Sequence, residues 1–411
     1  MKVVFFDYWT KGLRNFIQLN QELKKEGVDC FLLHTGSFRE ASDDIKSVQE
    51  INGVKCVEIS SLNTDKIYNA IEQIKPDVVI SLNTTYILDR ALVLSCRKFD
   101  VRLMFMMHGD RATGDQISEV VKSSKAGLLY KAIKMIRYAG FYIPNYLYTL
   151  RKCTPKRFYS FFPIKVLYSY FRNPALSRYY PKYADELIHD ECLIYTNKYV
   201  DYYTKVGYKK EQITKVGKPE LDPLFQKIIA NDFPKDELPD KVKSLVENGE
   251  KYAVYVENSY PEVQQYGWDD DYRNEHLQAV ESGLKLKGYK MVIKLHPTVD
   301  ERKIKVKDSI LIKKCDNATL MYYSEFAIVH ASSVNEVPVI LNKPVVFPRW
   351  GKSKGIVDYF ESWGITNDWE DPMELPELKL DQKNREKYIN EVVTFSDGNS
   401  MQRIIDHILK H

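Results

Sequence analysis

Residues 291–297 read MVIKLHP, an apolar run that closes on a lysine, a histidine and a proline. A short apolar run without alternation is typical of a strand that is buried on both faces, as in a parallel sheet covered by helices. The proline ends such a strand because it has no N–H to donate to a neighbour. We therefore expect a parallel strand over residues 290–295 that presents Lys294 and His296 at its carboxyl end, where the two cations can bind a diphosphate.

A second apolar run precedes a turn rich in small polar residues. Residues 326–329 are followed by HASSVNE at 330–336, which is expected to open a helix. Backbone N–H groups and hydroxyls at a helix N-terminus can bind phosphate, so Ser332 and Ser333 are candidates for that contact. Glu336, one turn into the helix, is placed to take the hydroxyl pair of a ribose. The same serines would also cap an ordinary helix, and capping is compatible with phosphate binding.

The rest of the chain repeats the alternation of apolar strands and helices that builds parallel sheets. Further strands are expected at 3–6, 30–34, 54–59, 78–82, 103–107, 191–196, 213–216, 252–257, 310–312 and 345–347. A chain of 411 residues is too long for one ordinary core. We expect an α/β protein with two Rossmann-like domains whose parallel sheets face a cleft. The expected boundaries are 1–230, with an insertion at 120–182, then 242–395, then a helix over 396–411 that can cross back onto the first domain.

Candidate residues in the first half follow the strand at 103–107. His108 and Asp110 flank Gly109 at that strand end, where an open α/β sheet places its ligands. A histidine and a carboxylate so placed suit a general base and its orienting partner. The alternative is a capped turn in which the backbone satisfies His108.

The segment 120–182 has an unusual composition. It holds thirteen Lys or Arg, fifteen Tyr or Phe, and no Asp or Glu. Cations interleaved with aromatic and aliphatic residues are typical of helices that lie on an anionic membrane surface. One alternative is an insertion that packs on its own domain, and another is RNA binding by stacking on the aromatics. We rank RNA below the membrane and expect no nucleic-acid partner.

Composition argues against several classes of protein. The net charge of +4 is small for this length, and the six cysteines show no spacing typical of zinc or disulfide sites. Residues 269–271 are three aspartates in what we expect to be an exposed polar loop rather than a metal site. Neither a secretory signal nor a run of about 20 apolar residues is present, so we expect a cytoplasmic protein that is peripheral at the inner leaflet. No cofactor and no metal are expected.

The order of these motifs resembles the GT-B superfamily: GT-B glycosyltransferases, UDP-N-acetylglucosamine 2-epimerases and teichoic-acid glycerophosphotransferases. The matching positions are His108-Gly109, His296-Pro297, Ser332-Ser333, Glu336 and Asn342-Lys343-Pro344. The turn at 216–219 is also similar to a family turn that faces the cleft, which makes Lys218 a further donor-binding candidate. The resemblance covers most of the chain apart from the insertion.

Departures from the family patterns favour a transferase over an epimerase. The acidic residue that epimerases carry after the strand at 78–82 is missing, and Glu257-Asn258-Ser259 replace their Thr-x-His-Arg-x-Glu loop. Bacterial sialyl- and Kdo-type transferases share a His-Pro motif and a later Ser/Thr motif that hold a CMP donor, and these match residues 294–297 and 332–333. The paired acidic residues usual in those transferases are not cleanly reproduced, which leaves the donor nucleotide open.

The resemblance implies an inverting, metal-independent glycosyltransferase of bacterial surface polysaccharide synthesis (capsule, O-antigen or wall polymer). Its nucleotide-sugar donor would be held by Lys294, His296, Ser332, Ser333 and Glu336. His108 or Asp110 would deprotonate a glycan or lipid-linked acceptor, and His296 would stabilise the departing phosphate. The alternatives are a CDP-alditol glycerol- or ribitol-phosphate transferase of the teichoic-acid type, and a non-catalytic protein that binds nucleotide or glycan.

Overall fold

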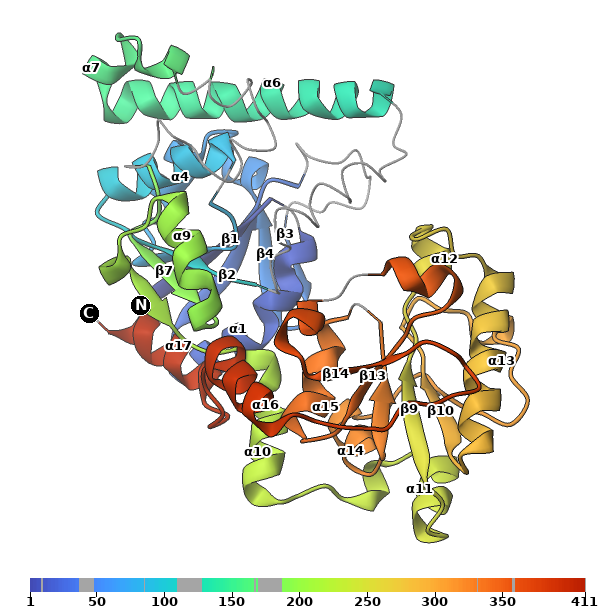
Figure 1. Cartoon of the computed structure of the whole chain (residues 1–411). Coiled ribbons are helices and arrows are strands. Elements are labelled where there is room, and N and C mark those ends of the chain that lie inside the picture. Colours follow the sequence, from blue (N-terminus) through green and yellow to red (C-terminus); the bar gives the residue numbers. More distant parts are fainter. Residues whose placement is uncertain are drawn as a thin grey trace. The chain divides into compact units, whose positions relative to one another are not determined.

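Two sheets dominated by parallel strands organise the chain, one in each of two units (Figure 1). One unit comprises Met1–Pro219 and Asn399–His411, and the other comprises Glu220–Gly398. The computed structural model describes residues 1–8, 10–36, 48–84, 86–108, 128–165, 168, 187–330, 332–356 and 359–410. We call these units the N-terminal unit and the C-terminal unit and describe each by itself.

The sheet of the N-terminal unit has eight strands in the order β3-β4-β2-β1-β5-β6-β7-β8. Its strands are β1 (Lys2–Asp7), β2 (Asp29–His34), β3 (Val48–Ile51), β4 (Val54–Glu58), β5 (Val78–Ser81), β6 (Arg102–Met106), β7 (Glu191–Ile194) and β8 (Ile213–Lys215). Every pairing is parallel except that of β3 with β4. The chain runs outward from β1 on both sides, which creates a topological switch point beside that strand.

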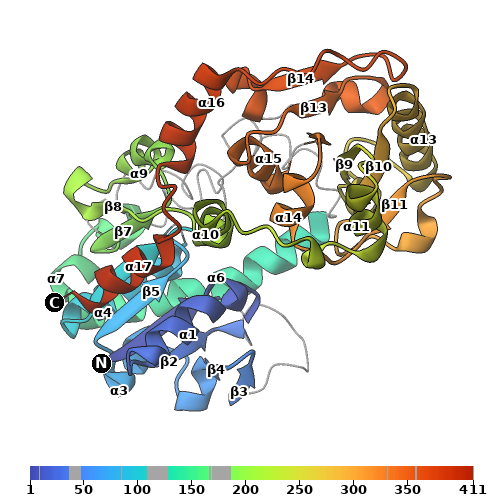
Figure 2. The ribbon, with the colours of Figure 1, turned by 90° about the horizontal axis from the view of Figure 1, so that it is seen from below.

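Helices cover both faces of this sheet. They are α1 (Ile17–Lys25), α3 (Ile67–Ile74), α4 (Ile87–Lys98), α6 (Leu128–Cys153), α7 (Pro155–Phe158), α9 (Val200–Val206) and α17 (Ser400–Leu409). Side chains alternate along β1, so Val4 and Phe6 pack with α3, α4 and α6, whereas Val3 and Phe5 pack with α1 and α17. The terminal helix α17 therefore completes the core of the N-terminal unit, and Figure 2 shows it on the same side as α1.

The C-terminal unit contains a fully parallel sheet in the order β11-β10-β9-β12-β13-β14. Its strands are β9 (Tyr252–Val256), β10 (Lys290–Lys294), β11 (Ile310–Ile312), β12 (Phe326–Ile328), β13 (Val345–Pro348) and β14 (Thr366–Trp369). Its helices are α10 (Asp222–Ala230), α11 (Asp240–Glu247), α12 (Tyr260–Val263), α13 (Asp270–Leu286), α14 (Asn317–Tyr322), α15 (Glu336–Ile340) and α16 (Gln382–Tyr388), with a 3₁₀ turn η8 (Ser333–Asn335) and a π-helical turn η11 (Ile389–Val393). Counted from β9, the strand order is 3-2-1-4-5-6, the Rossmann arrangement, with its switch point at β9.

The sequence of the insertion also predicts short helical pieces at 127–139 and 164–171, and the helix α6 extends well beyond the first of them. It is one helix of 26 residues with Pro144 inside it. In the part of α6 from residue 140 onward, Phe141, Tyr146 and Leu150 are buried in the same apolar cluster as residues of α3 and α4. This half of α6 therefore packs on its own unit, which agrees with the alternative that the insertion packs on its own domain. The parts of 120–182 at 120–127, 166–167 and 169–182 lie outside the described residues.

One local expectation for the C-terminal unit was wrong. Asp269 is the N-cap of α13, accepting a hydrogen bond from the Tyr272 N–H at 2.8 Å, and Asp270 and Asp271 form the first helical turn rather than a loop. Carboxylates are favourable there because they satisfy free N–H groups and face the positive end of the helix dipole.

Within the described ranges, no three His, Cys, Asp or Glu side chains are grouped so that they could hold a metal ion. The helices described there include none that is both long and apolar enough to span a bilayer. All six cysteines are free thiols.

Candidate functional site

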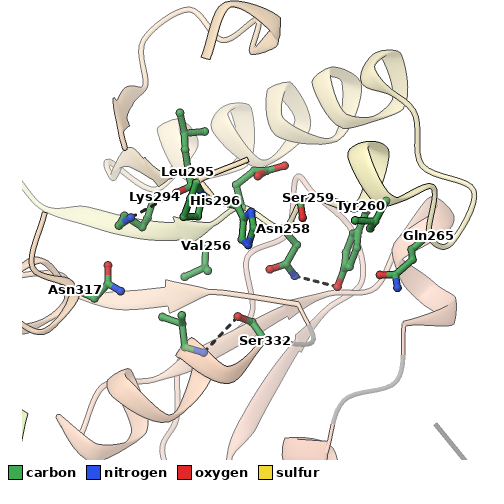
Figure 3. A pocket seen from close by; sticks show the side chains of 14 residues that line it. Val256, Asn258, Ser259, Tyr260, Gln265, Lys294, Leu295, His296, Asn317 and Ser332 are labelled. Carbon is green, nitrogen blue, oxygen red and sulfur yellow. Dashed lines mark hydrogen bonds between the residues drawn. The ribbon is translucent and has the colours of Figure 1, made fainter. Parts of the chain in front are cut away.

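A pocket of about 500 Å³ opens at the switch point of the C-terminal unit (Figure 3). It lies where β9 and β10 end and where the chain leaves β12, the edge at which parallel sheets bind ligands. Its polar lining comes from Glu257, Asn258, Ser259, Tyr260, Gln265, Lys294, His296, Asn317 and Ser332. Three of the residues expected from the sequence to bind a donor, Lys294, His296 and Ser332, are thus brought together.

Lys294 is the last residue of β10 and is half-buried in the pocket wall. Its Nζ donates hydrogen bonds to the carbonyl oxygens of Lys313 at 3.1 Å and Leu295 at 3.4 Å. An ammonium group has three protons, so two backbone acceptors leave one donor for a ligand. Lys294 therefore supplies a cation that is already held in position.

His296 is exposed and is oriented by Thr298. The backbone N–H of Thr298 donates to Nδ1 of His296 at 3.3 Å, and the Thr298 hydroxyl lies 2.7 Å from the same atom. Because a backbone N–H can only donate, Nδ1 is an acceptor, and the neutral ring carries its proton on Nε2. The imidazole therefore offers an Nε2–H donor to an anionic group.

Neutral polar groups complete the lining, as Figure 3 shows. Asn258 Nδ2 donates to the Tyr260 hydroxyl at 2.9 Å, and Ser332 Oγ accepts from the Val334 N–H at 3.3 Å. Ser332 is the N-cap of η8, so the expectation of a capping serine is confirmed for this residue. Hydroxyl and amide groups of this kind suit hydrogen bonds to phosphate or sugar oxygens.

Glu257 is a pocket residue whose role the sequence argument missed. It directly follows β9, its side chain is 2 % exposed, and its Oε2 has no hydrogen-bond partner among the described residues. Burial raises the pKa of this carboxyl to about 8, against the lowering effect of Arg273. The sequence did contain a signal for a site residue here, because Glu257 is an acidic residue placed immediately after a fully apolar strand.

The charge of Arg273 is shared among three carboxylates. Its guanidinium lies 3.5 Å from Glu257, 2.8 Å from Glu262 and 2.6 Å from Asp270, and Arg273 itself is fully buried. The arginine therefore compensates Glu257 only in part. This is a physical reason for the raised pKa of Glu257, since the nearby carboxylates repel its charged form.

Ser333 and Glu336 take different positions from Ser332. Ser333 begins η8, and its side chain lies outside the described residues. Glu336 begins α15, is buried, and accepts a hydrogen bond from the Tyr388 hydroxyl at 3.1 Å. It is not among the residues that line the pocket, so a contact between Glu336 and a ribose stays a prediction.

The remaining candidates belong to the N-terminal unit. His108 lies two residues after β6 and is half-buried, and Lys218 is buried shortly after β8. Asp110 and Gly109 lie outside the described residues. The structure adds a polar pair at the same strand edge, where Asn83 Nδ2 donates to Asp7 Oδ1 at 3.2 Å. Asp7 ends β1 and Asn83 follows β5, and neither was singled out in the sequence.

Buried imidazoles lie behind the pocket. The rings of His276 and His330 are 5.4 Å apart between centroids, and Nε2 of His330 lies 3.2 Å from the Tyr255 hydroxyl. Burial lowers the pKa of His276 to about 3 and that of His330 well below its usual value. Both rings are therefore neutral, and His330 acts as a packing group rather than as a cation.

Comparison with known proteins places the fold. No family model matches the chain, and no curated protein matches it. Among solved structures, the wall teichoic acid polymerase TagF with CDPG is 14% identical, covering 99% of this chain and 87% of that one, with a TM-score of 0.52. The Neisseria meningitidis UDP-GlcNAc 2-epimerase bound to UDP-GlcNAc is 15% identical over 100% of both chains, with a TM-score of 0.50. The Methanocaldococcus jannaschii UDP-GlcNAc 2-epimerase is 12% identical over 99% of both, with a TM-score of 0.48.

The chain has the GT-B fold. At these identities the likeness shows the architecture alone, and the expected fold class of two Rossmann-like α/β domains is confirmed. In GT-B terms, the pocket at β9 and β10 belongs to the C-terminal Rossmann-like unit, and His108 and Asp7 belong to the N-terminal one.

Proposed function

We propose that the protein is a glycosyltransferase whose nucleotide-sugar donor binds in the pocket at the switch point of the C-terminal unit. One observation carries this proposal: Lys294, the Nε2–H of His296 and the Ser332 hydroxyl line a single pocket. Fixed cations and hydrogen-bond donors at one site are what a nucleotide diphosphate requires. The GT-B structures bound to UDP-GlcNAc and CDPG support a nucleotide-linked substrate.

The transfer step follows from these groups. A base on the N-terminal side, His108 or Asp110, would remove the proton from an acceptor hydroxyl as its oxygen attacks the anomeric carbon. The bond from that carbon to the nucleotide phosphate breaks, and Lys294 and His296 stabilise the negative charge on the departing phosphate. Attack from the opposite face inverts the anomeric configuration. We further propose that Lys218, Ser333 and Glu336 contact the donor, and that no metal ion takes part.

The proposed acceptor is a glycan or lipid-linked glycan of a bacterial surface polysaccharide, such as a capsule, O-antigen or wall polymer. A lipid-linked acceptor would place the enzyme at the cytoplasmic side of the cell membrane.

A second candidate is an alditol-phosphate transferase, supported by the likeness to TagF solved with CDPG. On the same scaffold it would use a CDP-alditol and transfer a phosphodiester instead of a sugar. The two reactions differ in their products, because only the second product contains phosphate from the donor.

The test is thermal unfolding of the protein with UDP, CMP, CDP, GDP or dTDP. A nucleotide at about 100 times its Kd should raise the Tm by about 5–10 °C, since ligand binding stabilises the native state. The shift should be reduced in His296→Ala and Ser332→Ala. It should persist in Ser282→Ala, a matched control because Ser282 is exposed on α13 and bonds only within that helix.

The outcome separates the candidates. A shift with UDP, GDP or dTDP, followed by sugar transfer from the matching donor, supports the glycosyltransferase. A shift with CDP and a phosphate-containing product supports the alditol-phosphate transferase. If no nucleotide shifts the Tm, the donor proposal is wrong, and a shift without turnover in any assay would favour a binding protein.

A further inference from the structure

A patch of exposed aromatic and aliphatic side chains follows α6 in the N-terminal unit. Tyr159 is 72% exposed, Phe161 is 77% exposed and Ile164 is 62% exposed, and Tyr168 is also exposed. Tyr159 and Phe161 have the highest exposed fractions among the large hydrophobic residues in the described part of the chain. Such side chains cost free energy in water, so a cluster of them indicates a surface that is covered in use.

The patch is held rigidly by neighbours that point the other way. Phe158 and Phe162 pack against the core cluster of β1, α3, α4 and α6, while Tyr159 and Phe161 between them face solvent. The Cys153 thiol donates to the Leu94 carbonyl at 3.4 Å at the start of the same segment. The alternation thus anchors the segment to the unit and presents its other side chains outward. In Figure 1, α7 lies at the end of α6.

Exposed cations lie in the same stretch of chain as the exposed apolar side chains. They are Arg151, Lys152, Lys156, Arg157 and Lys165. The sequence from 120 to 182 contains no acidic residue. A fixed apolar patch with cations in the same stretch of chain is complementary to the interface of an anionic bilayer, where apolar side chains enter the acyl boundary and cations meet lipid phosphates.

We propose that residues 151–165 and 168, which we call the docking tip, bind the protein to an anionic lipid bilayer. Tyr159, Phe161 and Ile164 insert into the interface, and the five cations contact lipid headgroups. The second half of α6 is not the inserting element, because Phe141, Tyr146 and Leu150 are buried in its own unit. This inference does not depend on the transferase reaction.

A bilayer fits the docking tip better than RNA. Aromatic rings beside cations could stack on bases, but Ile164 has no π face, and an aliphatic side chain gains nothing from stacking. Insertion into lipid would bury Ile164, which is 62% exposed, whereas stacking on bases would leave it in water.

The experiment is co-sedimentation of the full chain with vesicles of phosphatidylcholine alone or mixed with phosphatidylglycerol. Binding should occur with the anionic vesicles and should fall as salt is raised, because the headgroup contacts are screened. The double variant Tyr159→Ser/Phe161→Ser should lose about tenfold or more in vesicle affinity, since two large apolar side chains no longer leave water. Lys156→Gln/Arg157→Gln should lose about tenfold and become less sensitive to salt.

The matched control is Ile229→Ser/Leu286→Ser, which removes exposed apolar residues from α10 and α13. It should bind vesicles as the wild type does. The thermal unfolding of each variant in the absence of lipid confirms that it folds.

Three results would overturn the proposal. The first is an intact protein that ignores anionic vesicles at low salt, and the second is equal binding by the wild type and the Tyr159→Ser/Phe161→Ser variant. The third is tip-dependent binding to single-stranded RNA, or tip-dependent self-association in sedimentation velocity, in place of vesicle binding. None of these bears on nucleotide binding, so the failure of this inference and the failure of the proposed function are separable.

Discussion

The carboxyl of Glu257 shows how a single position can differ from what its residue type suggests. A glutamate on a surface is charged at neutral pH, but this one is buried and shares Arg273 with two other carboxylates. With a pKa of about 8 it is mostly protonated at pH 7. A neutral carboxyl in this pocket repels an anionic ligand less than a carboxylate would, which is compatible with the proposed donor site.

A pH dependence of stability follows from Glu257. Its pKa rises from 4.5 in a model peptide to about 8 in the folded state, so between these values the folded state binds more protons than the unfolded state. The free energy of unfolding therefore falls as pH rises through this window, by an amount on the order of a few kcal/mol. Urea unfolding should show the fall in the wild type and a flatter profile in Glu257→Gln.

The matched control for this measurement is Glu262→Gln, which removes a second carboxylate from Arg273 but leaves Glu257 in place. Its profile should still fall between pH values of about 5 and about 8. Parallel profiles for the wild type and Glu257→Gln would contradict the assignment of the fall to this carboxyl.

At the scale of elements, one buried amide adds a specific attachment of α6 to the N-terminal unit. Asn145 Oδ1 accepts from the Ile67 N–H at 2.8 Å, and its Nδ2 donates to the Asp65 carbonyl at 2.7 Å. The side chain thus satisfies the first free N–H of α3, whose own N-cap provides no side-chain bond. The attachment of α6 is specific because apolar packing alone would allow it to slide.

Asn145→Ala should therefore destabilise the N-terminal unit by about 2–3 kcal/mol, since the buried Ile67 N–H and the partly buried Asp65 carbonyl lose their partner. Thermal unfolding followed by circular dichroism measures the change. Tyr148→Phe is the control on the same helix, because its hydroxyl bond to Asn69 at 3.1 Å is only partly buried. That variant should cost less than about 1 kcal/mol, and an equal loss in both variants would show that Asn145 has no special role.

The closing helix α17 depends on Arg102 of β6. Arg102 donates to the carbonyl oxygens of His407 at 2.9 Å, Ile408 at 3.1 Å and Lys410 at 2.7 Å, and it also pairs with Glu191. These carbonyls are the ones left without partners at a helix C-terminus, where a cation is also favoured by the dipole. One guanidinium thus caps the helix and ties it to the sheet.

Arg102→Lys should loosen α17, because an ammonium group cannot reach three carbonyls and a carboxylate together. Hydrogen exchange of the amides in Ser400–Leu409 should accelerate by about tenfold or more. Arg97→Lys is the control, since Arg97 pairs with Asp190 and the Ile188 carbonyl in the same unit without contacting α17. Unchanged exchange in Arg102→Lys would argue that apolar burial alone holds the helix.

For the whole molecule, each unit has its own core. The C-terminal unit is continuous in sequence and has apolar clusters on both faces of its sheet, whereas the N-terminal unit closes only when α17 returns to it. Ile404, Ile405 and Ile408 of α17 are buried beside Val3 and Phe5. The two units therefore differ in their tolerance of truncation.

A fragment of residues 220–398 should fold alone and keep the pocket at the ends of β9 and β10. A chain ending at residue 398 should lose stability in the N-terminal unit by an amount on the order of 5 kcal/mol, because three isoleucines no longer leave water. Calorimetry should show the transition of the fragment unchanged and the N-terminal transition lowered or lost. If the truncation left both transitions in place, α17 would be dispensable for the core.

Local sequence signals predicted most strands. The apolar runs at 3–6, 78–82, 103–107 and 290–295 correspond to β1, β5, β6 and β10, since a strand buried on both faces must be apolar throughout. The edge strands β3 and β14 were not predicted. Their burial patterns are mostly half-exposed, so they lack that signature.

The sequence by itself determined the α/β class and the positions of Lys294, His296 and Ser332 at strand ends, because periodicity and strand-ending residues act over a few neighbours. Only the tertiary structure decided that these three line one pocket, that Glu257 joins them as a buried acid, and that Glu336 accepts a hydrogen bond from Tyr388. Strand order brings together residues that are far apart in the chain, and burial sets the charge of a carboxyl. Both depend on neighbours supplied by distant segments, which no local pattern encodes.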